Sequence, residues 1–365
     1  MALSIGIIGL PNVGKSTIFN ALCKSELAEV ANYAFTTIEP NVGVVAVPDE
    51  RLEKLAEIEN SEKIVPATVK FIDIAGLISG AHKGEGLGNK FLAHIREVDA
   101  IAMVVRVFDN KDVIHISGDI NPKSDIEIIM TELVLADMET LKKRISAVEK
   151  EARTAEKTAA KKLMAYKKVE KLFEKSRPAI EAELDNEEKE LLKEANFLTL
   201  KPFLYIFNVS ESMVGEDPAD LIEELGLQGL VKEDEAIVIS AKIESELNSL
   251  PDIDREEYLK DLGLSEPGLN RLIISAYKTL NLVSFFTAGP MEARAWTINK
   301  GDKAPQAAGK IHSDFEKKFI KAEVIEFATF VKSGGWREAK EKGLVRLEGK
   351  DYQVKDGDVI FIHHG

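Results

Sequence analysis

The chain has 365 residues, with 48 Lys or Arg against 62 Asp or Glu, so its formal net charge is −14. Apolar residues make up 45% and charged residues 30%, a balance that excludes wholesale disorder, and the length predicts about two to three domains. The acidic balance argues against a protein coated with basic surface for DNA, and the single cysteine, Cys23, excludes an internal disulfide or a four-thiolate zinc site.

Neither membrane insertion nor secretion is expected from the sequence. No apolar run reaches the roughly 18 residues that a membrane-spanning helix needs. The N-terminus enters a strand-like run with no positively charged region ahead of it, so we expect no signal peptide. A single cysteine suits a reducing compartment, and we therefore expect a cytoplasmic protein.

The first expected element is a buried parallel strand over residues 3–8, where the sequence is apolar and rich in β-branched side chains. It is followed by Gly9-Leu10-Pro11-Asn12-Val13-Gly14-Lys15-Ser16, which fits the pattern G-x-x-x-x-G-K-[ST], and then by apolar residues at helical spacing. A glycine loop between a strand and a helix is the context in which this pattern binds phosphate. The alternative is a strand-to-helix turn with an incidental lysine.

This loop predicts a site for a nucleoside triphosphate. Backbone N–H groups of the loop wrap the β-phosphate, Lys15 reaches the β- and γ-phosphates, and the Ser16 hydroxyl binds Mg²⁺. We expect Lys15 to serve catalysis as well as binding. The expected nucleotide-binding residues here are Asn12, Val13, Gly14, Lys15, Ser16 and Thr17.

A second candidate metal ligand lies in the segment 33–41. A loop threonine at this point can bind Mg²⁺ only while a γ-phosphate is present, which is how such proteins report their nucleotide state. We choose Thr37, with Thr36 as the second choice. The alternative is a pair of threonines that merely begins a strand near residues 42–47.

The next strand, over residues 67–74, ends in Asp73-Ile74-Ala75-Gly76. An Asp at the carboxyl end of a strand lies on the side of an α/β sheet where ligands bind. Asp73 follows Lys15 by 58 positions and is expected to hold the metal through water, while the Gly76 N–H meets the γ-phosphate. The expected Mg²⁺ ligands are therefore Ser16, Thr37 and Asp73.

The middle of the chain predicts a projecting helical arm. Apolar or small residues recur at steps of four and three from position 141 to 172, which indicates a narrow helix–helix seam. We expect the helix to break at Ser176-Arg177-Pro178 and an acidic segment to return as its partner. Residues 141–177 hold 13 basic and 5 acidic side chains, a net of +8, which suits contact with a phosphate backbone. The alternative is a solvated helical surface, partly paired with the returning segment.

Two later strands lead into loops that we expect to surround the nucleotide base. The strand over 202–207 runs into Asn208-Val209-Ser210-Glu211, and the strand over 235–239 runs into Ser240-Ala241-Lys242. From these loops the expected base-pocket residues are Asn208, Val209, Glu211, Ser240 and Ala241.

Residues 282–365 predict a separate small α+β unit, with strand, turn and helix followed by further strands. Single aromatic and basic side chains in this part can stack on bases or contact phosphate, although a tryptophan is more often part of a core. The candidates for RNA contact are Trp296, Lys300, Lys303, Lys310 and His312.

Several of these runs resemble the YchF or Obg-like ATPase family, within the translation-factor-related class of GTPases. The resemblance is carried by residues 9–17, 35–41, 73–78 and 80–89 and by two later runs, 285–297 and 303–312, so it covers nearly the whole chain. It implies that the C-terminal unit is a TGS domain, a ubiquitin-like fold that recurs in ribosome- and RNA-associated proteins. It also implies ATP as the nucleotide.

The residues themselves favour the same base. Guanine-specific members of the class carry N-K-x-D where this chain has Asn208-Val209-Ser210-Glu211, so the lysine is replaced by Val209 and the aspartate by the longer Glu211. A polar pair that no longer fits guanine removes its advantage. We expect ATP to be preferred, with GTP as the weaker ligand and Asn208 able to contact adenine.

Hydrolysis is expected to be slow. Ras-like proteins place a water-orienting Gln directly after D-x-x-G, where this chain has Leu77. The resemblance singles out His115 instead, whose neutral imidazole can orient or activate water. The alternative for His115 is a solvated loop histidine.

We therefore expect an α/β P-loop nucleotide-binding domain over 1–125 and 200–281, a helical, coiled-coil insertion over 126–199, and a ubiquitin-like α+β TGS domain over 282–365. The expected function is a Mg²⁺-dependent ATPase switch that associates with the ribosome and RNA, with neither a membrane nor a specific DNA sequence as partner. The alternatives are an RNA-binding module with a largely regulatory GTP site and an enzyme that transfers phosphate to a small acceptor.

Overall fold

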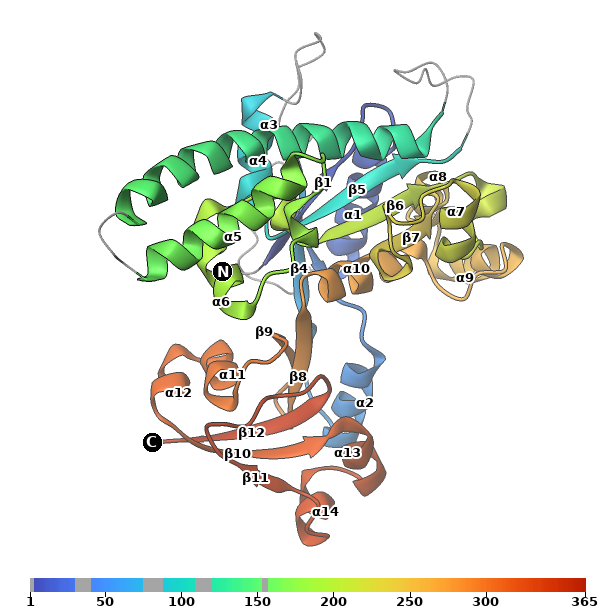
Figure 1. The fold of residues 1–365 in the computed structure, drawn as a ribbon. Helices are drawn as coiled ribbons and strands as arrows, with labels where there is room; N and C mark the ends of the chain where they lie inside the picture. The colour runs from blue at the N-terminus through green and yellow to red at the C-terminus, as the bar shows by residue number, and fades with distance from the viewer. Residues whose placement is uncertain (1–2, 30–40, 75–87, 109–119, 153–156) are drawn as a thin grey trace. The chain divides into compact units, whose positions relative to one another are not determined.

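The computed structural model describes residues 3–29, 41–74, 88–108, 120–152 and 157–365 (Figure 1). The described residues form two compact units. The first unit is built from residues 3–43 and 70–269, and the second from residues 44–69 and 270–365. None of the helices in the described part of the chain is long and apolar enough to cross a membrane.

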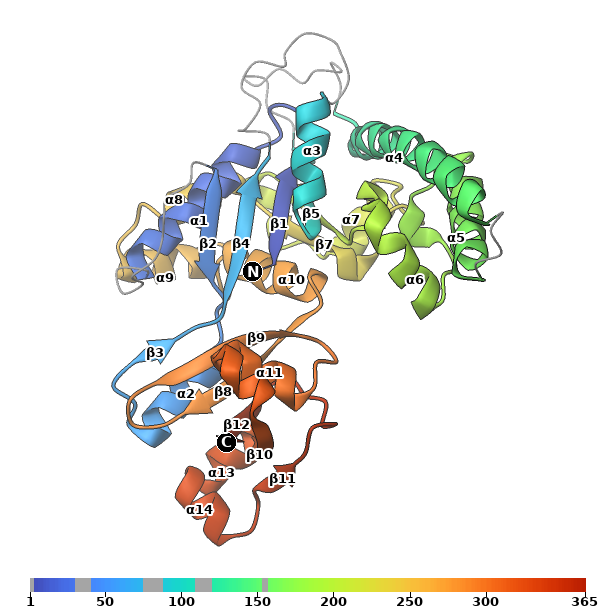
Figure 2. The same ribbon diagram turned by 90° about the vertical axis from the view of Figure 1, so that its left-hand side faces the viewer.

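The first unit is an α/β unit around a six-stranded sheet with the order β2-β4-β1-β5-β6-β7. The pairings of β1 with β4, β1 with β5, β5 with β6 and β6 with β7 are all parallel. Every residue of β1, β5 and β6 is buried, because the central strands of a parallel sheet are covered on both faces, and the edge strand β7 is buried throughout as well. Figure 2 shows β2 and β4 at one side of β1. The strands are β1 (Ser4–Ile8), β2 (Val42–Ala46), β4 (Thr68–Asp73), β5 (Ala100–Arg106), β6 (Phe203–Asn208) and β7 (Ala236–Ile239).

Helices cover this sheet, and α7 begins at a side-chain cap. Asp217 accepts a hydrogen bond from the backbone of Ala219 and precedes a proline at the first helical position of α7. The main core lies where the central strands meet α3, the first turns of α4, α7 and α8. The helices are α1 (Lys15–Glu29), α3 (Asn89–Glu97), α4 (Pro122–Ala152), α5 (Lys157–Phe173), α6 (Asn186–Leu192), α7 (Pro218–Glu224), α8 (Ala241–Leu247) and α9 (Asp252–Asp261).

The helical arm differs from the prediction in the place of its break. The helix expected to run unbroken to Ser176 is two helices, because α4 ends at Ala152 and α5 begins at Lys157. Figure 1 shows α5 running back alongside α4. The steps of four and three do not reveal that there are two helices, because both helices place apolar residues on the faces that meet.

The base of the arm is also more than a narrow seam. Phe197, from the segment after α6, packs edge-on against Tyr166 and Phe173 of α5, with ring centroids 6.2 and 5.8 Å apart. Asp137 of α4 is fully buried and accepts hydrogen bonds of 2.8 Å from the backbone of Leu198 and Thr199. Leu198 and Thr199 belong to the short 3₁₀ turn Leu198–Leu200, and two further 3₁₀ turns lie at Ala179–Glu181 and Lys193–Ala195.

The second unit is an α+β unit with a sheet of order β11-β10-β12-β8-β9-β3. β8 and β9 form an antiparallel pair in which Phe285 lies opposite Trp296, and the core beneath them gathers side chains from β10, β12 and α11. The strands are β3 (Ile64–Val65), β8 (Leu282–Ala288), β9 (Ala293–Asn299), β10 (Phe319–Glu326), β11 (Arg346–Glu348) and β12 (Asp358–His364). The helices are α2 (Glu50–Glu59), α10 (Gly268–Thr279), α11 (Ala304–Ile311), α12 (Ser313–Lys317), α13 (Phe327–Ser333) and α14 (Trp336–Glu341).

Most of the segment 44–69 lies in this second unit, and only its ends belong to β2 and β4, whereas the sequence predicts the whole segment in the nucleotide-binding domain. Short β3 pairs in parallel with β9, with Ile64 opposite Ala293, and α2 buries Leu52 and Leu55. Pairing between segments more than 200 positions apart leaves no periodic trace in the sequence, which is why the prediction assigned them to the neighbouring domain.

Candidate nucleotide site

The loop between β1 and α1 has a backbone that only particular residues adopt. Gly9 and Gly14 have φ values of 150° and 101°, and Asn12 has a φ of 63°. A Cβ atom on Gly9 would lie 2.5 Å from the carbonyl oxygen of Val104, and one on Gly14 would lie 2.3 Å from Nδ2 of Asn208. Both glycines are therefore required by close approach as well as by φ.

Lys15 begins α1 and lies over the loop that precedes it. Its side chain is buried, and its Nζ donates a hydrogen bond of 2.5 Å to the carbonyl oxygen of Leu10. Burial lowers the pKa of Lys15 from 10.5 to about 8, and the negative charge of Asp73 acts in the opposite direction. A phosphate group placed at the loop would favour the charged form of this amine.

Asp73 and Ser16 supply the oxygen atoms at this edge of the sheet. Asp73 is the last residue of β4 and lies opposite Ile7 of β1, two positions before the loop, with its side chain buried. Its backbone N–H donates to the carbonyl of Asn41 at 3.0 Å. Ser16 and Thr17 are exposed in the first turn of α1. A carboxylate and a hydroxyl are hard oxygen ligands, so this donor set fits Mg²⁺.

Asn208 joins the phosphate loop to the second base-side loop. Its Nδ2 donates to the carbonyl of Val13 at 2.9 Å, and its Oδ1 accepts a hydrogen bond of 3.0 Å from the backbone N–H of Ala241. The side chain is buried. One N–H and one lone pair of this amide are engaged with the protein, so Asn208 holds the two loops together, and its expected contact with adenine stays a prediction.

The loops after β1, β5, β6 and β7 enclose a cleft of about 670 Å³. The predicted residues brought together in its lining are Asn12, Gly14, Thr17, Asn208, Val209, Glu211, Ser240 and Ala241, while Val13, Lys15 and Ser16 lie in the adjoining phosphate loop. The lining also includes Phe108, Ser210, Lys242, Ser245 and Glu246, which the prediction did not select. Ser210 and Lys242 belong to the two loops that the sequence singled out, whereas Phe108, Ser245 and Glu246 reach the cleft through the packing of the chain around it.

An ion pair lies at the side of this cleft. The ammonium of Lys242 donates to the carboxylate of Glu211, and the hydrogen bond with Glu211 raises the pKa of Lys242. Glu246 lies 3.9 Å from the same ammonium and accepts a hydrogen bond of 2.8 Å from the Tyr258 hydroxyl. Glu211 and Lys242 are 45% and 69% exposed, so the carboxylate faces solvent and a cation.

Phe108 is the aromatic residue of the cleft that sequence reasoning missed. It comes two residues after β5, and the guanidinium of the fully buried Arg106 lies 4.7 Å from its ring centroid. Arg106 Nε also donates to the Phe108 carbonyl at 3.1 Å. An aromatic residue directly after a buried strand of this sheet is the signal that would have found it, since a base stacks well on such a ring.

Three predicted residues lie outside the described residues: Thr37, Gly76 and His115. The same holds for Thr36 and Leu77. Their predicted roles stay predictions.

Some of the candidate RNA contacts of the second unit already contact other residues of the protein through their side chains. Trp296 stacks on Phe285 and lies beneath Arg294, whose guanidinium is 4.1 Å from its ring centroid. Lys303 pairs with Asp351 at 2.8 Å, and His312 accepts from the backbone at the start of α12. The remaining candidates, Lys300 and Lys310, are exposed.

Comparisons with known proteins point to one family over nearly the whole length of the chain. A family model described as 50S ribosome-binding GTPase matches residues 4–150, and the YchF-GTPase C-terminal model, described as a protein of unknown function, matches residues 282–364. The chain is 50% identical to the ribosome-binding ATPase YchF of Bacillus subtilis and 51% identical to that of Haemophilus influenzae, covering 99% of this chain and 98% of each relative. The structure of the Schizosaccharomyces pombe YchF GTPase is similar with a TM-score of 0.90 and 37% identity, over 99% of this chain and 97% of that one.

Proposed function

This chain belongs to the YchF family, and on that premise we propose that it is a ribosome-binding ATPase whose conformation is set by the nucleotide in the cleft beside β1. Its relatives in Bacillus subtilis and Haemophilus influenzae carry the name of ribosome-binding ATPase. A ribosome-binding role belongs in the cytoplasm, where we propose that the chain acts.

The choice of base has to come from the cleft, because the names of the relatives differ between ATPase and GTPase. The observation that carries our choice of ATP is the ion pair between Glu211 and Lys242. A guanine site needs an unengaged carboxylate that accepts from N1–H and the exocyclic amine, whereas here the only carboxylate of the Asn208–Glu211 loop is held by a cation. Phe108 offers a stacking surface that does not discriminate between purines.

Several residues would act on the phosphates. Lys15 would move its ammonium from the Leu10 carbonyl to the β- and γ-phosphates, and the backbone of the loop would hold the β-phosphate. Ser16 and Asp73 would hold Mg²⁺, which when bound neutralises charge on the phosphate oxygens. We propose that Thr37 adds a ligand, that the Gly76 N–H meets the γ-phosphate and that His115 orients water for slow hydrolysis.

The ribosome contact is proposed for the arm and the C-terminal unit. Much of the positive charge of α5 is paired internally: Lys161 contacts Glu187, Lys162 contacts Glu194, and Lys168 contacts Glu188. On α4 the exposed side chains of Lys142, Lys143 and Lys150 have no carboxylate partner among the described residues. We propose that this side of the coiled-coil arm and the TGS domain at 282–365 contact ribosomal RNA.

The nucleotide choice is tested by competition of ATP and GTP for a fluorescent ATP analogue. We expect ATP to bind more tightly than GTP. Lys242→Ala should reduce the ratio of the two affinities, because it releases the Glu211 carboxylate. Lys232→Ala is the matched control, since it removes a surface ion pair of the same kind, with Glu235 at 2.6 Å, away from the cleft. Tighter binding of GTP by the unaltered protein would overturn the proposal.

The switch is tested by sedimentation with ribosomal subunits at two salt concentrations, with and without a non-hydrolysable ATP analogue. We expect more protein in the pellet with the analogue and less at the higher salt concentration. Equal pelleting with and without nucleotide would favour the RNA-binding module over the switch.

A further inference from the structure

The second unit holds a cavity of its own, of about 860 Å³. Its walls come from the start of α2, the end of α10, the first residues of β8 and the turn before β12. A volume of this size falls in the range of roughly 300–1,000 Å³ in which proteins bind small molecules. Part of the wall is apolar, with Val47, Leu282 and Val354 buried beside it.

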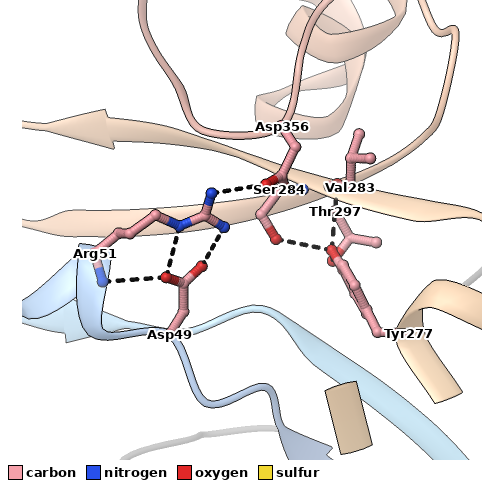
Figure 3. Close-up of polar contacts among 7 residues, drawn as sticks. All are labelled: Asp49, Arg51, Tyr277, Val283, Ser284, Thr297 and Asp356. Atoms are coloured by element: carbon pink, nitrogen blue, oxygen red, sulfur yellow. Dashed lines mark hydrogen bonds and ion pairs between the residues drawn. The ribbon is translucent and has the colours of Figure 1, made fainter. Parts of the chain in front are cut away.

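The floor of this cavity is a buried polar network. The hydroxyl of Tyr277 lies 3.0 Å from both Ser284 Oγ and Thr297 Oγ1, and it donates to the carbonyl of Val283 at 3.3 Å. Figure 3 shows this hydroxyl pointing toward Ser284 and Thr297. Tyr277 and Ser284 are 7% and 2% exposed. Because these hydroxyls position one another, the floor is preorganised.

One side of the cavity is closed by a clasp that consists of Asp49, Arg51 and Asp356. Arg51 binds Asp49 through Nε and Nη2 at 2.8 and 2.7 Å, and its Nη1 binds Asp356 at 2.7 Å (Figure 3). The second oxygen of Asp356 accepts from the backbone N–H of Ser284 at 2.9 Å, which ties the clasp to the floor. The Arg51 guanidinium is therefore satisfied by two carboxylates and is not the group that would recruit an anion.

Three further cations line the cavity, and their charges are available to a bound anion. These rim lysines are Lys278, Lys300 and Lys355; all three are exposed, and within the described residues their ammonium groups have no hydrogen bond or ion pair. With Arg51 the lining has four positive side chains against Asp49 and Asp356, which gives +4 − 2 = +2. A local net of +2 in a chain of net −14 is a field that draws anions to this place.

We propose that this cavity binds a small organic phosphate, with its phosphate at the rim lysines and its apolar part against the wall beside Leu282. Lysine ammonium groups act as point charges for phosphate, and the hydroxyl network beneath them would hold the polar edge of the ligand. A hollow of about 860 Å³ fits a nucleotide-sized molecule better than the extended backbone of an RNA. The site is independent of the cleft beside β1.

The test uses two small-molecule probes, AMP and inorganic pyrophosphate, and four forms of the full-length protein: the unaltered chain, a rim variant, a control variant and Lys15→Ala. The rim variant is Lys278→Ala/Lys300→Ala/Lys355→Ala, and the control is Lys317→Ala/Lys318→Ala/Lys332→Ala, which removes the same charge from exposed positions of the same unit outside the cavity. Isothermal titration calorimetry should show one saturable site for at least one probe, weakened at least tenfold in the rim variant and unchanged in the control. ATP affinity should stay unchanged in both variants, which separates this site from the nucleotide cleft.

Three results would overturn the proposal: no saturable binding of either probe, equal binding by the rim and control variants, or loss of the probe site on Lys15→Ala, which would place the probe in the phosphate loop. A 12-nucleotide RNA serves as a third probe. If the RNA loses affinity in the rim variant and binds more than 100-fold tighter than AMP, the cavity is part of an RNA surface and not a small-molecule site.

Discussion

Removal of the Asn208 amide should loosen the nucleotide cleft of the first unit. Asn208→Ala leaves the Val13 carbonyl and the Ala241 N–H, both buried partners of the amide, without their hydrogen bonds. An unsatisfied buried polar group costs about 1–3 kcal/mol, so the pair amounts to about 2–6 kcal/mol. Because the cleft beside Asn208 admits water, we expect the lower half of that range, about 2–4 kcal/mol.

The assay is urea unfolding followed by two probes. Far-UV circular dichroism includes the helices of the first unit, whereas both tryptophans of the chain, Trp296 and Trp336, lie in the second unit. We expect Asn208→Ala to lower the free energy of unfolding seen by circular dichroism and to leave the fluorescence transition in place. Asn248→Ala is the matched control, because it removes one half-buried hydrogen bond of 2.8 Å to the Ala21 carbonyl and should cost about 1 kcal/mol. A loss no larger than that of the control would refute the role given to Asn208.

Three further outcomes are expected. Burial holds the pKa of Lys15 at about 8 against 10.5 in the unfolded chain, so the unfolded chain binds more protons between these values. The free energy of unfolding should rise from pH 8 to pH 10.5 by about 3 kcal/mol, and a pH titration of stability should lose this rise in Lys15→Met. Gly14→Ala should lower ATP affinity in a binding titration, because its Cβ would meet the Asn208 amide. The loss of affinity should be smaller when Asn208→Ala is also present, and an equal loss in both backgrounds would contradict the clash. Asp137→Ala should lower the free energy of unfolding by about 3 kcal/mol in urea unfolding, since Asp137 accepts hydrogen bonds from Leu198 and Thr199. Asp137→Asn should lower it less, because the amide oxygen can still accept from this segment. Equal losses in the two Asp137 variants would refute this account.

Local patterns predicted the parts of the fold that depend on neighbours in sequence. The apolar run before Gly9 and the glycine loop after it fix a strand, a loop and a helix within 20 residues, and the structure has β1 and α1 there. Asp73 was placed at the end of a strand by the same reasoning, and β4 ends at that residue. The resemblance to the YchF family, which rests on runs of this kind, is confirmed by relatives of about 50% identity over the whole chain.

Contacts between distant segments were beyond the sequence patterns. Glu211 and Lys242 are 31 positions apart, and only the packing of β6 beside β7 brings their loops together. The role of Asn208 has the same origin, because its partner Val13 is 195 positions away. Periodicity failed in a different way in the arm, where two packed helices with matching apolar faces give the same pattern as one long helix.

The clasp of Arg51 and Asp356 spans 305 positions, and this separation shapes how the molecule is made. Residues 44–69 leave the translating ribosome early, but β9, the partner of β3, and the sheet that covers α2 are synthesised last. At a translation rate of about 5–20 residues per second, the apolar side of α2 stays without its packing partners for on the order of 10 to 50 seconds. The apolar side chains Leu52, Leu55 and Ala56 of α2 therefore lack this sheet while the segments in between are synthesised and fold. A polypeptide truncated before β9 lacks the sheet that covers these side chains.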